Sequence, residues 1–461
     1  MTYETFDTYV DTHAPAILER LASFCRIPSV SAENGPAMGQ AADFVVSLCR
    51  EIGVHTELSP QPAGPPVIVG KAGAGARCLM IYNHYDVQPP DPLDEWHSPP
   101  FDPLIRDGKM FARGVADNKG DLIARLTAIQ AYQETIGPLP VRILYVIEGE
   151  EEVGSLHLFK FSRRHEGLLR TADGCLWEYG YKNPDGQAVV NLGVKGILSV
   201  ELWVRTAGSD AHSSNGGIYP NAAWRLIEAL TTLRSPDGGV LVDGFMDHVQ
   251  TPSAPVVDLV DRLPFNEAKI LQAQGLKHGF LAGLTGPALL RRLYLEPTCT
   301  INGFISGYTG EGAKTVIPAE AMAKLDFRLV PDLTPALAMK LLTEHLARRG
   351  FHDIEVIDSE DGLLPWRTDP NAAISRAIQA ALAEVNAQAP VVNPSPSGSG
   401  PMYELCGMHG IPVAATGAAW YDSRIHAPNE NIRVSDFLEN IKVIGRLFQR
   451  FAEISFEETL S

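Results

Sequence analysis

The chain has 461 residues, of which 38 are Lys or Arg and 55 are Asp or Glu, so its formal net charge at pH 7 is -17. This balance has the wrong sign for a protein that neutralises the phosphates of a nucleic acid or docks on an anionic membrane. Hydrophobic residues make up 45% of the sequence, which excludes a disordered or collagen-like chain. We expect about two to four domains, with small-molecule or protein partners.

No segment has the pattern of a membrane span or an export signal. A run of about 18 apolar residues is absent, and the start, MTYETFDTYVDTHAPAILERL, carries acids where a signal peptide has a basic end and an apolar stretch. The six cysteines are scattered, without a CxxC pair. We therefore predict a cytoplasmic protein with reduced, mostly buried thiols.

Segments with helical periodicity alternate with short β-branched runs in the first part of the chain. The sequence predicts helices at 38–52 and 118–132, and buried strands at 79–82, 141–147 and 175–177. Such alternation is typical of a mostly parallel sheet wrapped by helices. Ligands of these sheets bind beyond the carboxyl ends of the strands.

The pattern changes after Gly196. Residues 197–206 alternate as a strand does, 221–233 is helical, and a strand at 321–330 precedes a helix at 335–348. Strand and helix, followed again by strand and helix, indicate an inserted α+β domain.

The first style returns from Asp369, with a long helix, a Ser/Gly loop, a strand at 411–415 and a final helix from Ser435. The sequence therefore predicts a discontinuous α/β domain with a mostly parallel sheet, formed by 1–196 and 367–461. A second domain is inserted into it at 197–366.

Candidate metal ligands follow the predicted strands. His84 and Asp86 come at the end of the strand at 79–82 and point to the same side, so the carboxylate can orient the imidazole for a metal. Alone, this spacing is also that of an ordinary surface pair. Asp117 opens the helix at 118–132, where it could bind a metal or simply cap the helix.

Three acids, Glu150 to Glu152, follow the strand at 141–147. A run of charges is often a solvated face, but acids crowded beyond a buried strand repel one another unless a cation offsets their charge. A divalent metal would do so, with one Glu as ligand and its neighbour as general base. Glu178 follows the strand at 175–177, and His426 lies in an Ile-His-Ala-Pro loop. Jointly, two His, one Asp and two Glu form the mixed nitrogen and oxygen ligand set that suits zinc or manganese.

These motifs resemble the co-catalytic di-zinc family of aminopeptidases, carboxypeptidases and aminoacylases, and within it the cytosolic dipeptidases of the carnosine-dipeptidase type. The matching stretches are NHYDVQPP with WHSPPFDP, GKMFARGVADNKG, EGEEEVGS, SDAHSS, GAKTVIPAEAMAKLDFRLVP and HAPNENI. The resemblance implies that 1–196 and 367–461 form the catalytic domain and that the insert is a ferredoxin-like lid and dimerisation domain. It also implies two divalent ions, zinc first, with manganese or cobalt as alternatives.

The resemblance further implies a role for each candidate residue of the catalytic domain. One ion would be held by His84 and Glu178 and the other by Glu152 and His426, with Asp117 bridging them. Glu151 would be the base that activates the bridging water, and Asp86 would orient His84. A cis peptide would follow Asp117.

In the insert, the resemblance implies that His212 reaches the active site of the neighbouring subunit of a homodimer and stabilises the tetrahedral oxyanion. Without the resemblance, His212 would be a plain surface residue. Arg328 would bind the substrate carboxylate, a task suited to a planar bidentate donor, although it could instead pair with Asp326. Three weaker candidates for substrate contacts are Asn302, Gly398 and Ser399.

The expected activity is metal-dependent hydrolysis of the amide bond of dipeptides or short peptides with a free C-terminal carboxylate, because the enlarged insert resembles the dipeptidase branch. An N-acyl amino acid deacylase or a carboxypeptidase of the same family is the main alternative, since the fold does not separate these activities. A non-catalytic metal-binding scaffold protein is a second class of function. The intact Glu151 argues against it. We expect no nucleic-acid and no membrane partner.

Overall fold

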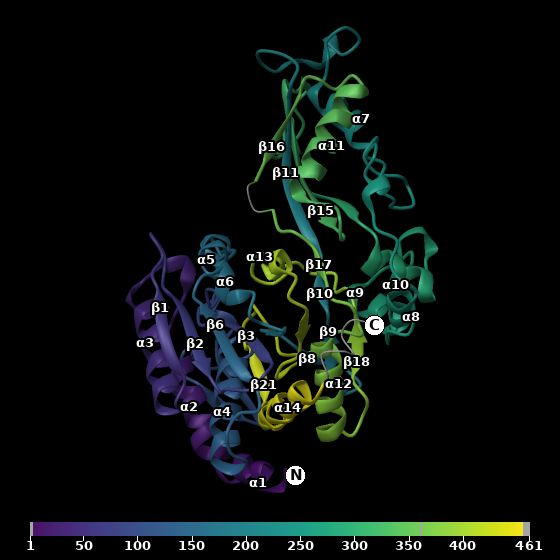
Figure 1. The fold of residues 1–461 in the computed structure, drawn as a ribbon. Helices are drawn as coiled ribbons and strands as arrows, with labels where there is room; N and C mark the ends of the chain where they lie inside the picture. Colours follow the sequence, from purple (N-terminus) through teal and green to yellow (C-terminus); the bar gives the residue numbers. More distant parts are fainter. Residues whose placement is uncertain (1–2, 360–361, 455–461) are drawn as a thin grey trace. The chain divides into compact units, whose positions relative to one another are not determined.

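The computed structural model describes residues 3–359 and 362–454, and the chain forms two compact units. The first unit comprises 1–193, 367–394 and 404–461, and the second comprises 194–366 and 395–403 (Figure 1). The short stretch 395–403, which the sequence analysis assigned to the discontinuous domain, thus packs with the second unit.

The first unit is built on an eight-stranded sheet with the order β1-β2-β6-β3-β7-β19-β9-β18. At its centre β3 pairs in parallel with β6 and β7, and β7 pairs in parallel with β19. At one edge β2 pairs antiparallel with both β1 and β6. The strands are β1 (His55–Ser59), β2 (Val67–Ala72), β3 (Cys78–His84), β6 (Arg142–Glu148), β7 (Gly174–Trp177), β9 (Val189–Asn191), β18 (Val391–Asn393) and β19 (Val413–Ala415). The predicted α/β class with a mainly parallel central sheet is confirmed.

Helices cover this sheet (Figure 1). They are α1 (Glu4–Thr12), α2 (Ala14–Cys25), α3 (Pro36–Glu51), α4 (Lys119–Thr135), α5 (Leu158–Arg164), α6 (Glu166–Leu169), α12 (Ala373–Val385) and α14 (Val434–Glu453). On α14 the buried residues Phe437, Ile441, Ile444 and Phe448 recur every three or four positions, which puts them on one face of the helix. α4 differs, because most of its residues are buried, including the charged residues Lys119, Asp121 and Arg125.

Short strands complete the first unit. β4 (Leu104–Arg106), β5 (Lys109–Phe111) and β21 (Asn431–Arg433) form one small sheet, and β8 (Tyr181–Lys182) pairs with β20 (Ala419–Trp420). β10 (Gly193–Val194), β17 (Trp366–Arg367) and α13 (Met402–Leu405) lie where the chain passes between the units.

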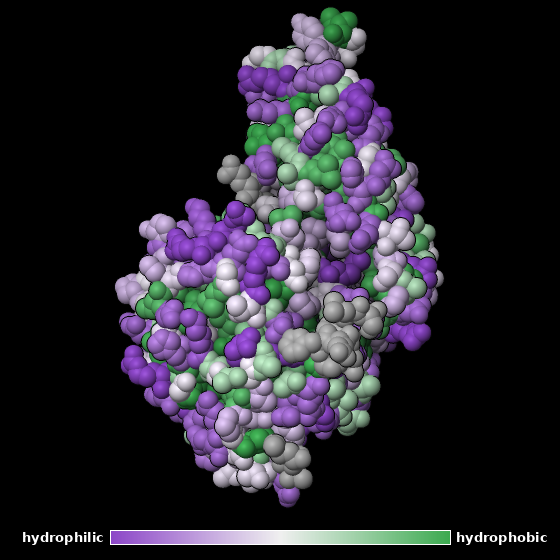
Figure 2. Space-filling model, in the orientation of Figure 1, coloured by the Kyte–Doolittle hydropathy of each residue, from purple (hydrophilic) through white to green (hydrophobic). Residues whose placement is uncertain are grey.

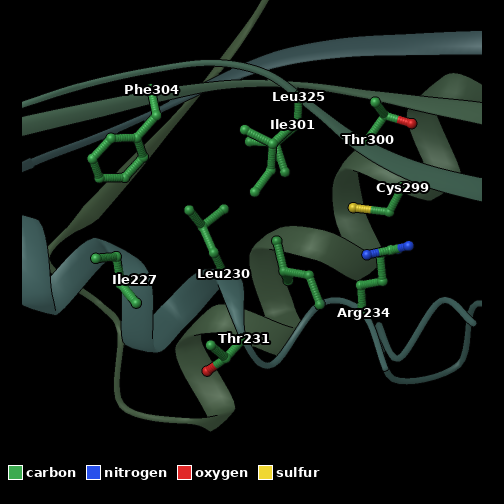
Figure 3. A pocket seen from close by; sticks show the side chains of 10 residues that line it. Ile227, Leu230, Thr231, Arg234, Cys299, Thr300, Ile301, Phe304 and Leu325 are labelled. Carbon is green, nitrogen blue, oxygen red and sulfur yellow. The ribbon is translucent and has the colours of Figure 1, made fainter. Parts of the chain in front are cut away.

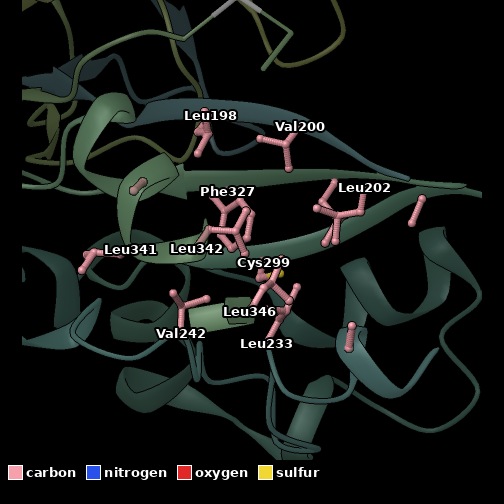
Figure 4. Close-up of a cluster of buried hydrophobic side chains, with 14 of the residues drawn as sticks. Leu198, Val200, Leu202, Leu233, Val242, Cys299, Phe327, Leu341, Leu342 and Leu346 are labelled. Carbon is pink, nitrogen blue, oxygen red and sulfur yellow. The ribbon is translucent and has the colours of Figure 1, made fainter. Parts of the chain in front are cut away.

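The second unit contains a four-stranded antiparallel sheet with the order β13-β15-β11-β16. Its elements follow one another as β11 (Gly196–Arg205), α7 (Ala222–Leu230), β13 (Thr298–Ser306), β15 (Glu320–Leu329), α11 (Pro335–Arg348) and β16 (Ile354–Asp358). This is the β-α-β-β-α-β order of the ferredoxin-like motif. The two helices share one core with a face of the sheet, in which Leu202, Phe327 and Leu342 are buried (Figure 4).

Between α7 and β13 the chain adds an extension with its own small core. Its helices are α8 (Ala254–Asp261), α9 (Glu267–Gln274) and α10 (Gly286–Leu295), and Val256, Val260 and Leu290 pack together between α8 and α10. A two-stranded sheet, β12 (Ala211–His212) with β14 (Val316–Ile317), also belongs to this unit.

Hydrophilic residues dominate the face of the molecule that Figure 2 draws, with apolar residues scattered between them. Among the residues that the structure describes, no helix is both long and apolar enough to span a bilayer. All six cysteines are buried free thiols, as the sequence predicted.

Candidate metal centre

The candidate ligands lie at one edge of the large sheet because three neighbouring parallel strands end there. His84 is the last residue of β3, and Glu178 directly follows β7. Glu151 and Glu152 follow β6 in a short 3-10 turn (Glu151–Val153). In a parallel sheet the carboxyl ends of adjacent strands share an edge, so residues far apart in the sequence meet there.

Asp117 lies between two pairs of side chains. His84 Nε2 is 3.0 Å from Asp117 Oδ1 and 3.3 Å from Glu178 Oε2. His426 Nε2 is 3.2 Å from Asp117 Oδ2 and 3.0 Å from Glu152 Oε2. Each carboxylate oxygen of Asp117 thus faces a different histidine, and this is the arrangement that a bridging ligand of two ions needs.

The donor set fits divalent cations. Single ligand atoms of His84, Asp117 and Glu152 lie within 4.8 Å of one another. Within the described part of the chain, Glu152 Oε1 and Glu178 Oε2 are buried and accept no hydrogen bond. A buried carboxylate oxygen without a partner is costly, and a bound cation would supply that partner. The imidazole nitrogens and carboxylate oxygens that converge here are the ligand types of zinc and manganese.

The charges of the site favour a cation as well. Burial raises the pKa of the Glu178 carboxyl to about 8, and the negative charge of Asp117 adds to this effect. Burial, together with the charge of Glu178, raises the pKa of Glu151 well above its ordinary value. Hydrogen bonds to Asp117 and Glu152 raise the pKa of His426 to about 10. The raised pKa values of Glu151, Glu178 and His426 favour protonated side chains, and metal ions can replace such protons.

Asp86 connects His84 to the turn that carries Glu151 and Glu152. Its carboxylate lies 3.2 Å from His84 Nδ1 and accepts hydrogen bonds from the backbone N–H groups of Glu151 and Glu152, at 3.3 and 3.0 Å. When Nδ1 of His84 donates to Asp86, Nε2 is left as the ligand atom. The predicted orienting partner of His84 thus also fixes the turn that carries the candidate base.

Glu150, the first of the three acids, is turned to a different partner. Its carboxylate pairs with His157 Nδ1 at 2.8 Å. The peptide bond between Asp117 and Asn118 is cis, as the resemblance implies.

A family model described as peptidase family M20/M25/M40 matches residues 80–450. The chain belongs to this family. It is 30% identical to the Cys-Gly metallodipeptidase of Schizosaccharomyces pombe over 364 aligned residues. The aligned region covers 76% of each chain. It is 26% identical over 471 residues to the Beta-Ala-His dipeptidase of Homo sapiens, covering 97% of this chain and 92% of the human protein.

Solved structures of M20 proteins share the fold. A metallo-carboxypeptidase of the M20 family from Sulfolobus solfataricus superposes with a TM-score of 0.85 at 34% sequence identity, over 95% of this chain and 99% of that one. Human carnosine dipeptidase 1 superposes with a TM-score of 0.78 at 24% identity, over 98% of this chain and 100% of that one. The predicted family and the predicted class of enzyme, a metallopeptidase, are confirmed, and an M20 peptidase is expected to bind divalent metal.

The remaining predicted residues of this M20 peptidase lie in its second unit. Arg328 on β15 donates from Nη1 to Ser399 Oγ at 2.8 Å, and its Nε is 3.9 Å from Asp326 Oδ1. The Gly398 carbonyl accepts from the backbone N–H of Lys195, so the 398–399 loop is held close to Arg328.

Two further predicted residues lie on other elements of the second unit. His212 is exposed on β12, where Nδ1 accepts from the Ser214 N–H at 3.1 Å and Nε2 is 3.3 Å from Thr315 Oγ1. Asn302 lies in a bulge of the edge strand β13, between Ile301 and Gly303. Their roles stay predictions.

Glu430, which its sequence pattern did not mark as a site residue, is fully buried. Its carboxylate accepts hydrogen bonds from Arg113 Nη1 at 2.7 Å and from the backbone N–H groups of Gly114, Ala116 and Asp117, at 3.0, 2.9 and 3.1 Å. It therefore holds the loop that presents Asp117. The sequence gives no local signal for this, because Glu430 and Arg113 are 317 positions apart and the other partners are backbone groups.

Proposed function

We propose that this M20 peptidase is a di-metal dipeptidase that hydrolyses the amide bond of dipeptides or short peptides with a free C-terminal carboxylate. The observation that carries the proposal is the pair of histidine–carboxylate clusters that share Asp117, with Glu151 directly before Glu152 in the same turn. One ion would be held by His84, Glu178 and Asp117, the other by Glu152, His426 and Asp117. Zinc is the first choice, with manganese or cobalt as alternatives.

When bound, two such ions would polarise the scissile carbonyl and acidify a water between them. Glu151 would take the proton from this water and pass it to the leaving amine. Asp86 would keep Glu151 in place through the backbone of the turn. The protein would thus contribute a single proton carrier whose position is fixed by hydrogen bonds.

We infer that Arg328 binds the substrate carboxylate. Its side chain is 35% exposed, and its guanidinium donates to the Ser399 hydroxyl, which in turn donates to the Gly196 carbonyl at 3.2 Å. A planar guanidinium can donate two parallel hydrogen bonds to a carboxylate. Gly398 and Asn302 remain weaker candidates for contacts with the substrate.

Names of related proteins support the substrate class. The Cys-Gly metallodipeptidase of Candida albicans and the Beta-Ala-His dipeptidase of Rattus norvegicus align with at least 95% of this chain. A carboxypeptidase is the second candidate, because the M20 structure that shares 34% of its sequence with this chain is a metallo-carboxypeptidase. The buried free thiols fit the cytoplasm as the proposed compartment.

We also propose a homodimer in which His212 acts in the partner's active site. An apolar groove of about 700 Å³ lies between α7 and β13 in the second unit, lined by Ile227, Leu230, Ile301 and Phe304 (Figure 3). β13 is an edge strand whose Ile301, Phe304 and Ile305 are exposed. Exposed apolar side chains beside an unpaired strand edge favour a second copy of the chain as the occupant.

The dimer proposal is tested by Phe304→Glu. We expect a monomer by analytical ultracentrifugation that keeps its metal content and loses peptidase activity. A variant that stays dimeric, or a monomer with wild-type activity, would contradict the proposed arrangement.

The proposed activity is tested with wild type and Glu151→Gln, each loaded with Zn²⁺ or Mn²⁺ or treated with chelator. The substrates are free dipeptides, longer peptides and N-acetyl amino acids. We expect dipeptides to be cleaved only by metal-loaded wild type. Sequential release of C-terminal residues from longer peptides would favour the carboxypeptidase, and cleavage of N-acetyl amino acids alone would favour a deacylase. Bound metal without any turnover would favour a scaffold protein.

A further inference from the structure

Helix α4 carries a fully buried arginine, Arg125, which binds the backbone of the proposed ligand Glu178. Nη1 donates to the carbonyl of Tyr82 at 2.7 Å and to Asn83 Oδ1 at 2.9 Å. Nη2 donates to the carbonyls of Trp177 at 2.5 Å, Glu178 at 2.9 Å and Thr416 at 3.3 Å. One side chain thus reaches the ends of three strands: β3, β7 and β19.

These contacts begin where the backbone pairing of the strands stops. β3 and β7 pair from Leu79 with Gly174 to Ile81 with Leu176. After this last pair, the ladder does not continue. Backbone pairing therefore does not hold Tyr82 and Asn83 beside Trp177 and Glu178. The guanidinium bridges these two stretches, directly before His84 and at Glu178 itself.

A chain of side-chain hydrogen bonds adds a second link between the same strands. The Asn83 Oδ1 atom accepts from Arg125 and from the Tyr145 hydroxyl at 2.7 Å, so its amide group has a fixed orientation with Nδ2 as donor. Asn83 Nδ2 donates to Asn118 Oδ1, and Asn118 Nδ2 donates to the Glu178 carbonyl at 2.9 Å. The Glu178 carbonyl is therefore held both by Arg125 and by Asn118.

We propose that Arg125 is the positioning residue for one half of the metal centre, the ion held by His84 and Glu178. This inference rests on the proposed ligand assignment. Arg125 does not touch an ion or a substrate. It acts by keeping the backbone around both ligands at the separation that places His84 Nε2 3.3 Å from Glu178 Oε2.

The other half of the centre is held by different groups. The Glu152 N–H donates to Asp86, and the Glu152 carboxylate accepts from Gln88 Nε2 at 3.0 Å. His426 lies in a loop, with a backbone φ of 60°. Because no hydrogen-bond partner of Arg125 among the described residues belongs to this half, its loss is expected to affect the two ions unequally.

An arginine suits this position for a geometric reason. Five acceptor atoms at the ends of three strands surround the two terminal nitrogens of this buried side chain. A guanidinium presents five donors in a rigid planar fork, whereas the three donors of a lysine ammonium leave a single atom. Lysine at this position therefore keeps the charge but not the bridge.

The test measures Zn²⁺ affinity and stoichiometry of chelator-stripped protein, by titration against a competing chromophoric chelator. His426→Ala isolates the half that contains His84, and Glu178→Ala isolates the half that contains His426. We expect Arg125→Met to weaken Zn²⁺ binding about 10- to 100-fold in the His426→Ala background, as is usual for residues that orient ligands. In the Glu178→Ala background we expect no change in affinity.

Arg77→Met is the matched control, because Arg77 is a buried arginine that precedes the opposite end of β3 and donates to the Ile454 carbonyl. It is expected to lower thermal stability and leave both Zn²⁺ affinities unchanged. Arg125→Lys provides the measurement if Arg125→Met fails to fold, and it should also weaken only the His84 half.

Equal weakening of both halves, or wild-type affinity in both Arg125 variants, would overturn the role of Arg125. Fewer than two ions bound by wild type would instead overturn the proposed metal centre, and the inference with it. The two failures are therefore distinguishable by the stoichiometry of the wild type.

Discussion

Replacing Asp121 by Asn is predicted to make the stability of the first unit less dependent on pH. Asp121 is buried on α4, where Oδ1 accepts from the Ala418 N–H at 2.8 Å and from Asn440 Nδ2 at 3.0 Å. Its Oδ2 accepts no hydrogen bond from the described residues. Burial raises the pKa of this carboxyl from 3.8 to about 7, in spite of the opposing charge of Arg125.

The magnitude follows from the two pKa values. A carboxyl with a pKa of 3.8 in the unfolded chain and about 7 in the folded protein costs about 4 kcal/mol once both states are ionised, as an upper limit. Between these values the folded protein binds more protons, so the free energy of unfolding decreases as the pH rises through this window. Asp121→Asn keeps an Oδ1 acceptor and removes the charge, so its stability relative to wild type should increase with pH.

The assay is urea unfolding of the metal-free proteins, followed by circular dichroism at a series of pH values from 4 to 8. Taking the difference between variant and wild type cancels the titration of the metal ligands, which both proteins share. Asn440→Ala is the control, because it removes a hydrogen bond to the carboxylate but leaves the carboxyl in place. Its stability relative to wild type should decrease as the pH rises. A difference for Asp121→Asn that is constant across this range would refute the reasoning.

Three further predictions concern the metal centre and the substrate. Asp117→Ala should lose both Zn²⁺ ions and Glu178→Ala one, because Asp117 faces both histidines, and metal analysis after dialysis distinguishes these results. Glu430→Gln should weaken Zn²⁺ binding about 10- to 100-fold, measured by chelator competition, since Glu430 holds the Asp117 loop; unchanged affinity would contradict this. Arg328→Lys should raise the KM for dipeptides and leave kcat nearly unchanged, because it removes bidentate binding of the carboxylate; a fall in kcat alone would assign Arg328 another role.

The position of the candidate ligands at one edge of the sheet could be predicted from local patterns in the sequence, whereas their assignment as ligands rests on the family resemblance. Each of His84, Glu152 and Glu178 follows a short apolar run that becomes a central strand, and a parallel sheet brings such positions to one edge. Periodicity in the sequence also predicted several helices and strands. For example, the helix predicted at 38–52 is α3 (Pro36–Glu51), and the strand predicted at 321–330 is β15 (Glu320–Leu329).

Other strands have only a weak pattern in the sequence. β13 was not predicted, and its sequence, TCTINGFIS, contains a bulge and exposes the apolar residues Ile301 and Phe304. Because the extra residue of the bulge shifts the side chains after it to the other face, the usual alternation of buried and exposed residues is lost. β9 and β18 are only three residues long. A strand of this length is too short to show a detectable alternation of apolar and polar residues.

The groups that hold the ligands in place could not be predicted for a different reason. Glu430 and Arg125 bind mainly backbone N–H and carbonyl groups. Every residue offers such groups, so the partner has no sequence signature. Only the fold determines which of them remain unpaired at the end of a strand or in a loop, and therefore where a buried charge can satisfy them.

The two halves of the metal centre should release their ions at different rates. In one half the side chains are His84, with no exposure, and Glu178, 10% exposed, on adjacent strands of the sheet. In the other, His426 is 51% exposed and belongs to a loop. Because an exposed loop opens more readily than a central strand, an excess of chelator should remove Zn²⁺ from the protein in two kinetic phases. The fast phase should be absent from His426→Ala. A single phase in wild type, or a fast phase that persists in His426→Ala, would show that the burial of the ligands does not control release.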